Sequence, residues 1–269
     1  MSFLLNRFGR PHRPARGPVD PVHPGWGEYT ETLVLPGDSA TQEKSVRLRP
    51  LQLSDGAAWR MMRLSDREIL ESVEPTVVDS WETAHSSRMW RSFFFSIKQL
   101  ADMGSAVPFA IEVEGKFVGQ LTLGGIQHGA ISECWIGYWV HSSYAGQGIA
   151  TAACGLGVDH AFKRVGLHRV TATFLPENVA SRKILEANGF REEGYLQRNL
   201  HIFGEWRDHF LVALTNDEFS QDAVTRLIHA RGYGVPPPSR QIKRYSGGLQ
   251  VERGLTLICD HPTGRSLYL

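Results

Sequence analysis

The stretch Tyr144-Ala-Gly-Gln-Gly-Ile-Ala-Thr151 decides the fold of this chain, because it joins a strand to a helix. The residue pattern predicts an aromatic strand over Glu133–Val140 and a helix that begins at Ile149. A glycine-rich turn at such a junction lets several backbone N–H groups converge, and the helix start adds unpaired donors. Gly146 and Gly148 let the backbone approach an anion without a Cβ clash. The stretch therefore predicts a phosphate site made of backbone groups.

Two glycines in a strand-to-helix turn also have a purely steric explanation, since many such turns need glycine for their backbone geometry. The turn lacks the third spaced glycine of a dinucleotide fingerprint and the Gly-Lys-Ser/Thr of a P-loop. Both differences disfavour dinucleotide and nucleoside-triphosphate ligands. The choice between a phosphate site and an ordinary turn therefore depends on a second motif.

The second motif is Leu175-Pro-Glu-Asn-Val-Ala-Ser-Arg-Lys-Ile-Leu-Glu-Ala-Asn-Gly-Phe190, which follows a predicted strand. Asn178 is suited to cap the helix within it, and Gly189 stands where a C-terminal glycine belongs. Together the motifs resemble the GNAT family of acetyl-CoA-dependent N-acetyltransferases, in detail the RimJ/RimL branch that acetylates ribosomal-protein N-termini. The resemblance covers roughly residues 45–215 and includes further marks: Val46-Arg-Leu-Arg-Pro50 with Asp55, the strand end Gly137-Tyr-Trp-Val140, and Gly204-x-Trp-x-Asp208.

The resemblance implies an α+β fold, with a mixed, largely antiparallel, twisted sheet flanked by helices. In this family the cofactor strand splays away from its neighbour, often at a bulge, and Gly137 is the natural bulge position here. The predicted order of elements agrees with an α+β layout. Further strands are predicted near residues 30–36, 45–51, 107–113, 117–123, 168–175, 195–200 and 209–214, and further helices near 56–64, 80–102 and 217–230.

The resemblance also implies which residues hold acetyl-CoA. Backbone groups of Tyr138 and Val140 would contact the pantetheine arm, while their side chains would pack in the core with the neighbouring tryptophans. Asn178 would contact the pantetheine, cap its helix, or do both. The diphosphate would lie on the loop and helix start: Ala145, Gly146, Gln147, Gly148, Ile149, Ala150 and Thr151. Many family members carry Arg or Gln where this chain has Ala145, so backbone donors must suffice here. No metal is implied.

GNAT chemistry, as the resemblance implies it, is direct attack of an amine on the acetyl thioester, so no protein nucleophile is required. Many members carry a tyrosine acid where this chain has Glu186, whereas the RimJ/RimL branch places a serine near the cofactor sulfur. That serine carries over to Ser181 as proton donor, with an ordinary helix-start role as the alternative. Glu133 lies near a strand glutamate of several members and is the candidate base.

The acceptor amine is predicted from a missing residue. Some relatives carry a glutamate before the last hairpin, and the corresponding position here is Leu200. Without that strong base, an α-amine with a pKa near ~7.7–8.0 is a better acceptor than a lysine amine near ~10.4. The leading hypothesis is therefore acetylation of a protein N-terminus, with a ribosomal protein as one candidate. The acceptor is expected between residues 63–74 and 199–208.

Three other functions stay open. A small-amine acetyltransferase would take a polyamine or an aminoglycoside, and a non-catalytic module would bind acyl-CoA without releasing a thiol. A polyamine site would be lined by carboxylates that otherwise form a solvated face: Asp66, Glu68, Glu71, Glu74 and Asp79. An RNA-binding adaptor would use the basic, proline-rich residues 1–27, which are otherwise predicted to be disordered.

Composition and length indicate which ligands, compartment and domain organisation to expect. The 269 residues carry a net charge of +1, which gives no bulk attraction to nucleic acid. Cys134, Cys154 and Cys259 are predicted to be buried and reduced, as in the cytoplasm. No apolar run approaches the roughly 18 residues of a membrane span, and the charged start predicts no signal peptide. The acetyltransferase domain is expected over residues 28–231 and a tail without an assigned role over 232–269; the oligomeric state is left open.

Overall fold

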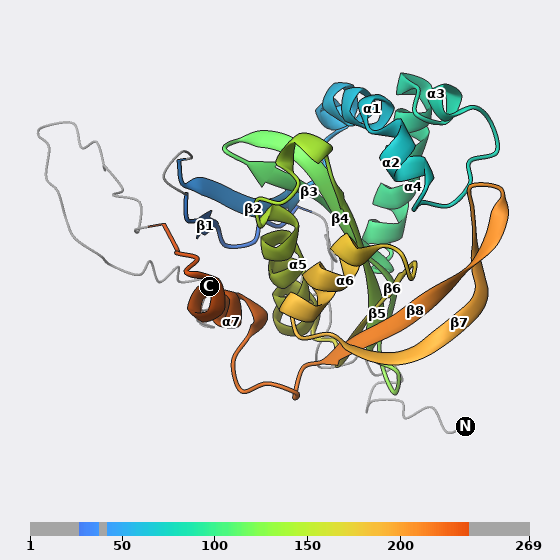
Figure 1. Ribbon diagram of the computed structural model, residues 1–269. Coiled ribbons are helices and arrows are strands. Elements are labelled where there is room, and N and C mark those ends of the chain that lie inside the picture. Colours follow the sequence, from blue (N-terminus) through green and yellow to red (C-terminus); the bar gives the residue numbers. More distant parts are fainter. Residues whose placement is uncertain (1–26, 38–41, 237–269) are drawn as a thin grey trace, which may run out of the picture. The chain divides into compact units, whose positions relative to one another are not determined.

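The computed structural model describes residues 27–37 and 42–236 of the chain. These residues form one eight-stranded sheet with the strand order β1-β2-β3-β4-β5-β6-β8-β7 (Figure 1). Every neighbouring pair is antiparallel except β5 and β6, which run parallel. The predicted α+β fold, with a mixed and largely antiparallel sheet, is confirmed. None of the described helices is both long and apolar enough to cross a membrane.

The strands are β1 Leu33–Leu35, β2 Lys44–Pro50, β3 Ala106–Val113, β4 Lys116–Gln127, β5 Glu133–Val140, β6 Arg169–Phe174, β7 Arg191–Ile202 and β8 Glu205–Thr215. The helices are α1 Gly56–Ser65, α2 Arg67–Glu71, α3 Trp81–Ala84, α4 Ser87–Asp102, α5 Ile149–Asp159, α6 Val179–Ala187 and α7 Ala223–Arg231. Short 3₁₀ turns η1 Leu53–Asp55 and η2 Ser142–Tyr144 precede α1 and α5, and the π-helical turn η3 His160–Val165 extends α5.

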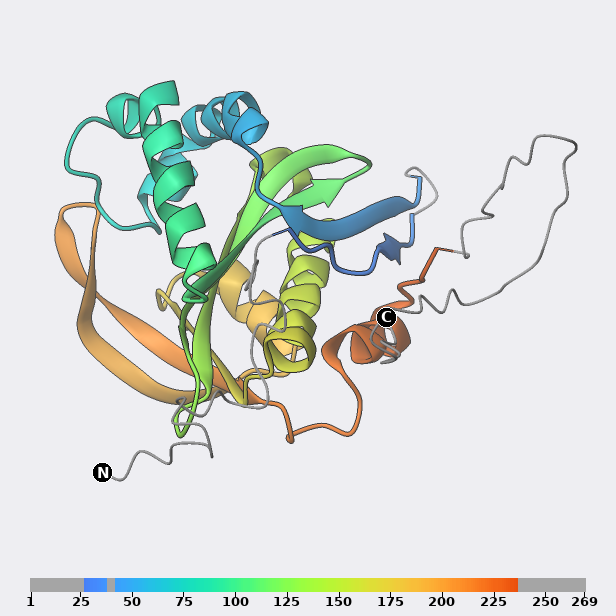
Figure 2. The ribbon, with the colours of Figure 1, turned by 180° about the vertical axis from the view of Figure 1, so that it is seen from behind.

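Helices cover both faces of the sheet. Helices α5 and α6 lie on the face shown in front in Figure 1, and α4 lies on the face shown in front in Figure 2. Successive β3 residues alternate between the layers: Phe109 and Ile111 join the core around α5, whereas Ala110 joins the aromatic cluster of α1 and α4. Trp90 and Phe94 of α4 are buried in that cluster and attach this helix to the sheet.

The opening between β5 and β6 is the feature that positions the site. The two strands pair only at their beginnings, where Glu133, Cys134 and Trp135 lie opposite β6, and they diverge afterwards. The predicted splay is therefore confirmed. The predicted bulge at Gly137 is wrong, because Gly137 pairs regularly with Thr122 and the irregular register lies before Trp135. Gly137 instead leaves room for the Trp135 ring, which a Cβ would approach to 3.3 Å.

The predicted helix over residues 80–102 is two helices. Ser80 caps α3 by accepting the Thr83 N–H at 3.2 Å, as predicted, but Ser86 begins a second helix by accepting the Met89 N–H at 3.4 Å. A helical apolar pattern does not show such a break, because serine also occurs inside helices. Near the chain end, Asp222 caps α7 through the Thr225 N–H at 2.7 Å, so this helix begins later than predicted.

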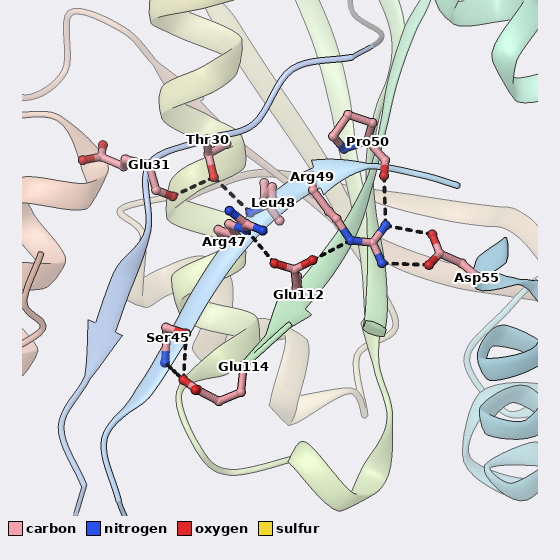
Figure 3. Close-up of polar contacts among 10 residues, drawn as sticks. All are labelled: Thr30, Glu31, Ser45, Arg47, Leu48, Arg49, Pro50, Asp55, Glu112 and Glu114. Atoms are coloured by element: carbon pink, nitrogen blue, oxygen red, sulfur yellow. Dashed lines mark hydrogen bonds and ion pairs between the residues drawn. The ribbon is translucent and has the colours of Figure 1, made fainter. Parts of the chain in front are cut away.

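An ion-pair network ties the sheet to the start of α1 (Figure 3). Arg49 holds Asp55 with two hydrogen bonds of 2.9 and 2.7 Å, and both side chains are only 7% exposed. Glu112 of β3 accepts from Arg49 at 2.7 Å and from Arg47 at 2.6 Å. Asp55 also accepts the Gln52 N–H at 2.8 Å, which shapes the turn before the helix. The paired arginines of β2 and the following aspartate thus have a structural role.

The folded part continues beyond α7. Val34 and Gly234 exchange backbone hydrogen bonds of 2.8 and 2.7 Å, which attach the chain after α7 to β1. The domain boundaries proposed from the sequence stay a proposal. The predicted basic arm and the weak strand near residues 255–259 lie outside the described residues, except that Gly27 is described.

Candidate active site

The glycine-rich loop before α5 has the backbone form that a phosphate cradle needs. Gly146 and Gly148 have φ angles of +72° and +78°, in the left-handed region that favours glycine. The first helical bond runs from the Ala152 N–H to the Gly148 carbonyl at 2.9 Å. No acceptor within the helix is therefore available to the N–H groups of Ile149, Ala150 and Thr151. A Cβ on Gly146 would meet nothing within 4 Å, so this side of the loop is open.

The side chains of the loop have structural partners. Gln147 donates to the Ser143 carbonyl at 2.9 Å and accepts from Lys44, while Ile149 and Thr151 are buried. The Ala145 N–H bonds to the Ser142 carbonyl at 2.9 Å and closes the preceding turn. The loop can therefore offer an anion chiefly its backbone N–H groups from Gly146 onward. The assignment of these residues to a diphosphate stays a prediction.

A buried carboxylate connects the loop to the helices at the other side of the opening. Asp66, between α1 and α2, accepts from the Ser142 N–H at 2.7 Å and from the Ser142 hydroxyl at 2.6 Å. Asp66 is 5% exposed, so the alternative of a solvated acidic face is wrong for this residue. The turn that precedes the glycine-rich loop is thereby fixed against the α1–α2 corner.

A cavity of about 170 Å³ lies where β5 and β6 diverge. It brings together Tyr138 of β5 with Asn178 and Ser181 at the start of α6, three residues that the sequence analysis proposed for the site. Asn178 caps α6 by accepting the Ser181 N–H at 3.0 Å, which confirms the predicted cap. The Ser181 hydroxyl lies 3.3 Å from the Tyr138 hydroxyl, and either oxygen can be the donor.

The Tyr138 side chain does more than pack in the core. It contacts the main apolar cluster, as predicted, but its hydroxyl reaches the cavity. Burial raises the pKa of the Tyr138 phenol well above its usual range, so this hydroxyl keeps its proton at neutral pH. The alternation of β5 could have shown that Tyr138 faces the α5 and α6 side. Trp135, in contrast, is 49% exposed, and its predicted core role is wrong.

Glu133 lies at the opposite end of β5 from these hydroxyls. Its carboxylate accepts from the Arg169 Nε at 2.8 Å, and it is absent from the described lining of the cavity. This placement favours an ion-pair role, and its role as base stays a prediction without geometric support. Leu200 does line the cavity, so the hairpin position that carries a glutamate in some relatives faces the same space.

Glu74 lies at the end of the region expected to face the acceptor, but the sequence does not distinguish it from the other acidic residues around α2. The Glu74 side chain is 24% exposed and binds Arg63 through both carboxylate oxygens, one of them at 2.8 Å from Nη1. Burial raises the pKa of the Glu74 carboxyl, although the Arg63 charge opposes the shift. The pair lies beside the same opening as Tyr138.

The described cysteines and acidic residues suggest neither a thiol nucleophile nor a metal centre. Cys134 and Cys154 are buried, as predicted, and burial raises the pKa of the Cys134 thiol to about 12. In the described part of the chain, no group of three or more His, Cys, Asp or Glu side chains is arranged to hold a metal ion. Cys259 lies outside that part.

Replacing Gly148 by valine is expected to weaken acetyl-CoA binding by about tenfold or more. Valine disfavours a φ of +78°, and its Cβ would lie 2.6 Å from the Tyr233 hydroxyl, so the loop must shift. Gly129→Val is the matched control, because Gly129 also has a positive φ but nothing lies within 4 Å of its would-be Cβ. Isothermal titration with acetyl-CoA measures both, and unchanged affinity in folded Gly148→Val would disprove the phosphate site.

Comparison with known proteins adds an independent finding. The sequence matches the model of the acetyltransferase (GNAT) domain over residues 45–191. Among solved structures, the chain resembles Mycobacterium smegmatis RimJ in complex with CoA-disulfide, with 46% sequence identity and a TM-score of 0.75. That match covers 80% of this chain and 100% of the RimJ chain.

Two named proteins are similar at lower identity. The ribosomal protein uS5-alanine N-acetyltransferase of Escherichia coli (strain K12) is 29% identical over 170 residues, which cover 62% of this chain and 86% of that enzyme. The probable N-acetyltransferase YjcK of Bacillus subtilis (strain 168) is 29% identical over 180 residues, which cover 66% of this chain and 98% of that protein.

Proposed function

The chain belongs to the GNAT acetyltransferase family, and we propose that its acceptor is the α-amine of a protein N-terminus. As a member of this family, it is an N-acetyltransferase with acetyl-CoA as the donor. A ribosomal protein is the first candidate acceptor, since the name of the relative from Escherichia coli specifies one. A ribosomal acceptor also implies the cytoplasm as the compartment of action. No metal has a role in this proposal.

The proposal is supported chiefly by two adjoining cavities of different volume. The cavity of about 170 Å³ at the splayed strands shares Val73 and Asn178 with a wider groove of about 420 Å³. The groove runs past Val179, Phe203 and Arg207 towards solvent. An extended peptide could lie in the groove with its first residue and amine in the narrow cavity. A short first side chain fits that cavity best.

A bridge between two segments limits access to the cavity. The Thr76 N–H bonds to the His201 carbonyl at 2.8 Å, and the Gly204 N–H bonds to the Thr76 hydroxyl at 3.2 Å. The tip of the β7–β8 hairpin thus meets the connection between α2 and α3 (Figure 1). An acceptor that enters beside this bridge as a single extended chain fits the proposal.

Residues of this chain have distinct roles towards the donor. Acetyl-CoA supplies the acetyl group as an activated thioester. The loop N–H groups from Gly146 onward would hold its diphosphate, and the free β6-facing edge of β5 at Tyr138 and Val140 would bind its pantetheine arm. Ser181 would lie near the sulfur and return a proton to it. Asn178 would set the start of α6 and with it the Ser181 hydroxyl.

The polyamine alternative has less support from the geometry. A polyamine needs several free carboxylates, but Glu71 accepts from Arg67 at 3.0 Å and Glu74 binds Arg63. Asp66 is used by the η2 turn. Of the described acidic residues around α2, only Glu74 lines the cavity at the splayed strands, while Glu71 and Asp79 line a separate cavity near α3. An RNA-binding role would rest on the basic arm, which lies outside the described residues apart from Gly27.

A peptide panel tests the proposal. Peptides that begin with Ala, Ser or Met are expected to release thiol from acetyl-CoA, whereas the same peptides with a blocked α-amine and a free lysine are expected to be inert. The physical reason is the lower pKa of the α-amine, near ~7.7–8.0 against ~10.4 for lysine. Mass spectrometry locates the acetyl group. Inert peptides together with rapid turnover of a polyamine or an aminoglycoside would replace this proposal by the small-amine function.

A further inference from the structure

Glu74 is the one acidic residue in the described lining of the cavity between β5 and β6. It follows α2 and shares that cavity with Tyr138, Ser181 and Leu200. Its carboxylate therefore adjoins the space where an amine must meet a thioester if the donor lies along β5. The nearby position of Leu200 offers no proton acceptor, so a base in this cavity must come from another element.

Arg63 fixes the orientation of the Glu74 carboxylate. Its guanidinium lies 5.7 Å from the ring centroid of Trp59, 5.5 Å from that of Trp81 and 5.1 Å from that of Trp139. The Trp81 indole N–H also donates to the Arg63 carbonyl at 2.8 Å. Such packing holds a guanidinium in one place. The two hydrogen bonds from Arg63 then orient both oxygens of Glu74. The carboxylate is therefore already in position before the substrate binds.

A second contact holds Glu74 from the other side. The residues directly after it, Pro75 and Thr76, form the bridge to the β7–β8 hairpin at Ile202 and His201. Glu74 is thus held between Arg63 of α1 and the tip of the β7–β8 hairpin. It forms part of the wall of the cavity at the splayed strands. The Glu74 side chain, although 24% exposed, is therefore held in place by an ion pair and by the backbone bridge that follows it.

We propose that Glu74 binds the ammonium group of the acceptor and accepts its first proton, and that Arg63 is the positioning residue for this step. The inference rests on the proposed function, since it assigns the amine end of the same site. A carboxylate has about four lone-pair positions, and the Arg63 fork uses two, so two remain for an amine. Burial raises the pKa of Glu74, which brings this carboxyl nearer to the pKa of its substrate.

The proton balance of the step is simple. The ammonium gives one proton to Glu74, and the neutral nitrogen then forms a bond to the acetyl carbon while the carbon–sulfur bond breaks. The departing sulfur takes a proton from the Ser181 hydroxyl, which regains one from the nitrogen as the amide forms. The proton on Glu74 passes to solvent, so one proton is released for each amide made. The free thiol and the amide are the products.

The other titratable groups at the cavity are worse acceptors. His209 of β8 is 3% exposed, its Nδ1 lies 3.1 Å from the Arg207 carbonyl, and burial lowers its pKa. The Tyr138 phenol of β5 keeps its proton, because burial raises its pKa. Arg63 of α1 carries a permanent positive charge. Glu74 is the anion among these groups, so it can both bind an ammonium by charge and accept its proton, which a neutral His209 or Tyr138 does not combine.

The test is Glu74→Gln, with Glu71→Gln as the matched control from the same segment. Glu71 is paired with Arg67 and does not line the narrow cavity. Glu74→Gln is expected to lower kcat/KM for an Ala- or Ser-started peptide about 10²-fold near neutral pH. The loss should shrink as the pH rises from about 7 to about 9.5, because the α-amine is then already neutral. Arg63→Lys should give a smaller loss with the same pH dependence.

Acetyl-CoA affinity and the thermal unfolding midpoint of each variant are measured alongside. Acetyl-CoA affinity should stay close to wild type in Glu74→Gln, since the diphosphate loop is untouched, whereas the unfolding midpoint should fall because the buried Arg63 loses its charged partner. Wild-type peptide turnover in Glu74→Gln, or a loss that is equal at all pH values, would overturn the inference. If wild-type protein acetylates no peptide at all but turns over small amines, the proposed function fails instead, so the two failures are distinguishable.

Discussion

Replacing Ser181 by alanine is expected to lower kcat about 10²-fold, because the leaving sulfur loses its proton donor. Ser181 lines the cavity at the splayed strands, and its hydroxyl lies 3.3 Å from the Tyr138 hydroxyl, through which the proton released by the nitrogen can be relayed back to Ser181. Acetyl-CoA affinity should change little, since the diphosphate would be held by the distant loop. Stopped-flow thiol release and isothermal titration separate these two effects.

Tyr138→Phe is the companion variant, because it removes one hydroxyl without changing the volume of the ring. If the two hydroxyls work in sequence, the double variant should be no slower than the slower single variant. Multiplied losses would mean that they act independently. Equal turnover in Ser181→Ala and wild type would return Ser181 to an ordinary helix-start role and leave Tyr138 as the donor to test.

The second large effect is expected on stability. Replacing Asp55 by alanine should lower the free energy of unfolding by about 3 kcal/mol, because a buried ion pair then loses one partner. Arg49 would keep Glu112 as its one charged partner in this network, together with the Pro50 carbonyl, and the Gln52 N–H would lose its acceptor. Urea unfolding, compared at equal slope, measures the change.

The control for this effect is an exposed ion pair in α4. Lys98 and Asp102 are 35% and 45% exposed, so Asp102→Ala should change the free energy of unfolding by about 0.5 kcal/mol or less. A similar small change in Asp55→Ala would show that the network of Arg49, Asp55 and Glu112 does not stabilise the junction between the sheet and α1. That result would also weaken the structural explanation of the paired arginines in β2.

Local sequence alone determined the elements around the donor site. Gly146 and Gly148 require left-handed backbone, and Asn178 and Gly189 mark both ends of one helix, so short-range geometry fixes the loop and α6. The alternating pattern of β5 likewise follows from residues close in sequence. These features depend on neighbours within a few positions, and the sequence shows such neighbours directly.

Tertiary structure decided the acceptor side. Glu74 looked like one of several surface acids, and Glu133 looked like a base, because sequence spacing does not show which carboxylates face a common cavity. The fold pairs Glu133 with Arg169, while Arg63, three tryptophans and the hairpin tip hold Glu74 at the opening. The break at Ser86 was also not predicted, because serine occurs inside helices as well as at their starts. Contacts between distant elements set the burial and charge environment of each side chain, and these decide its chemistry.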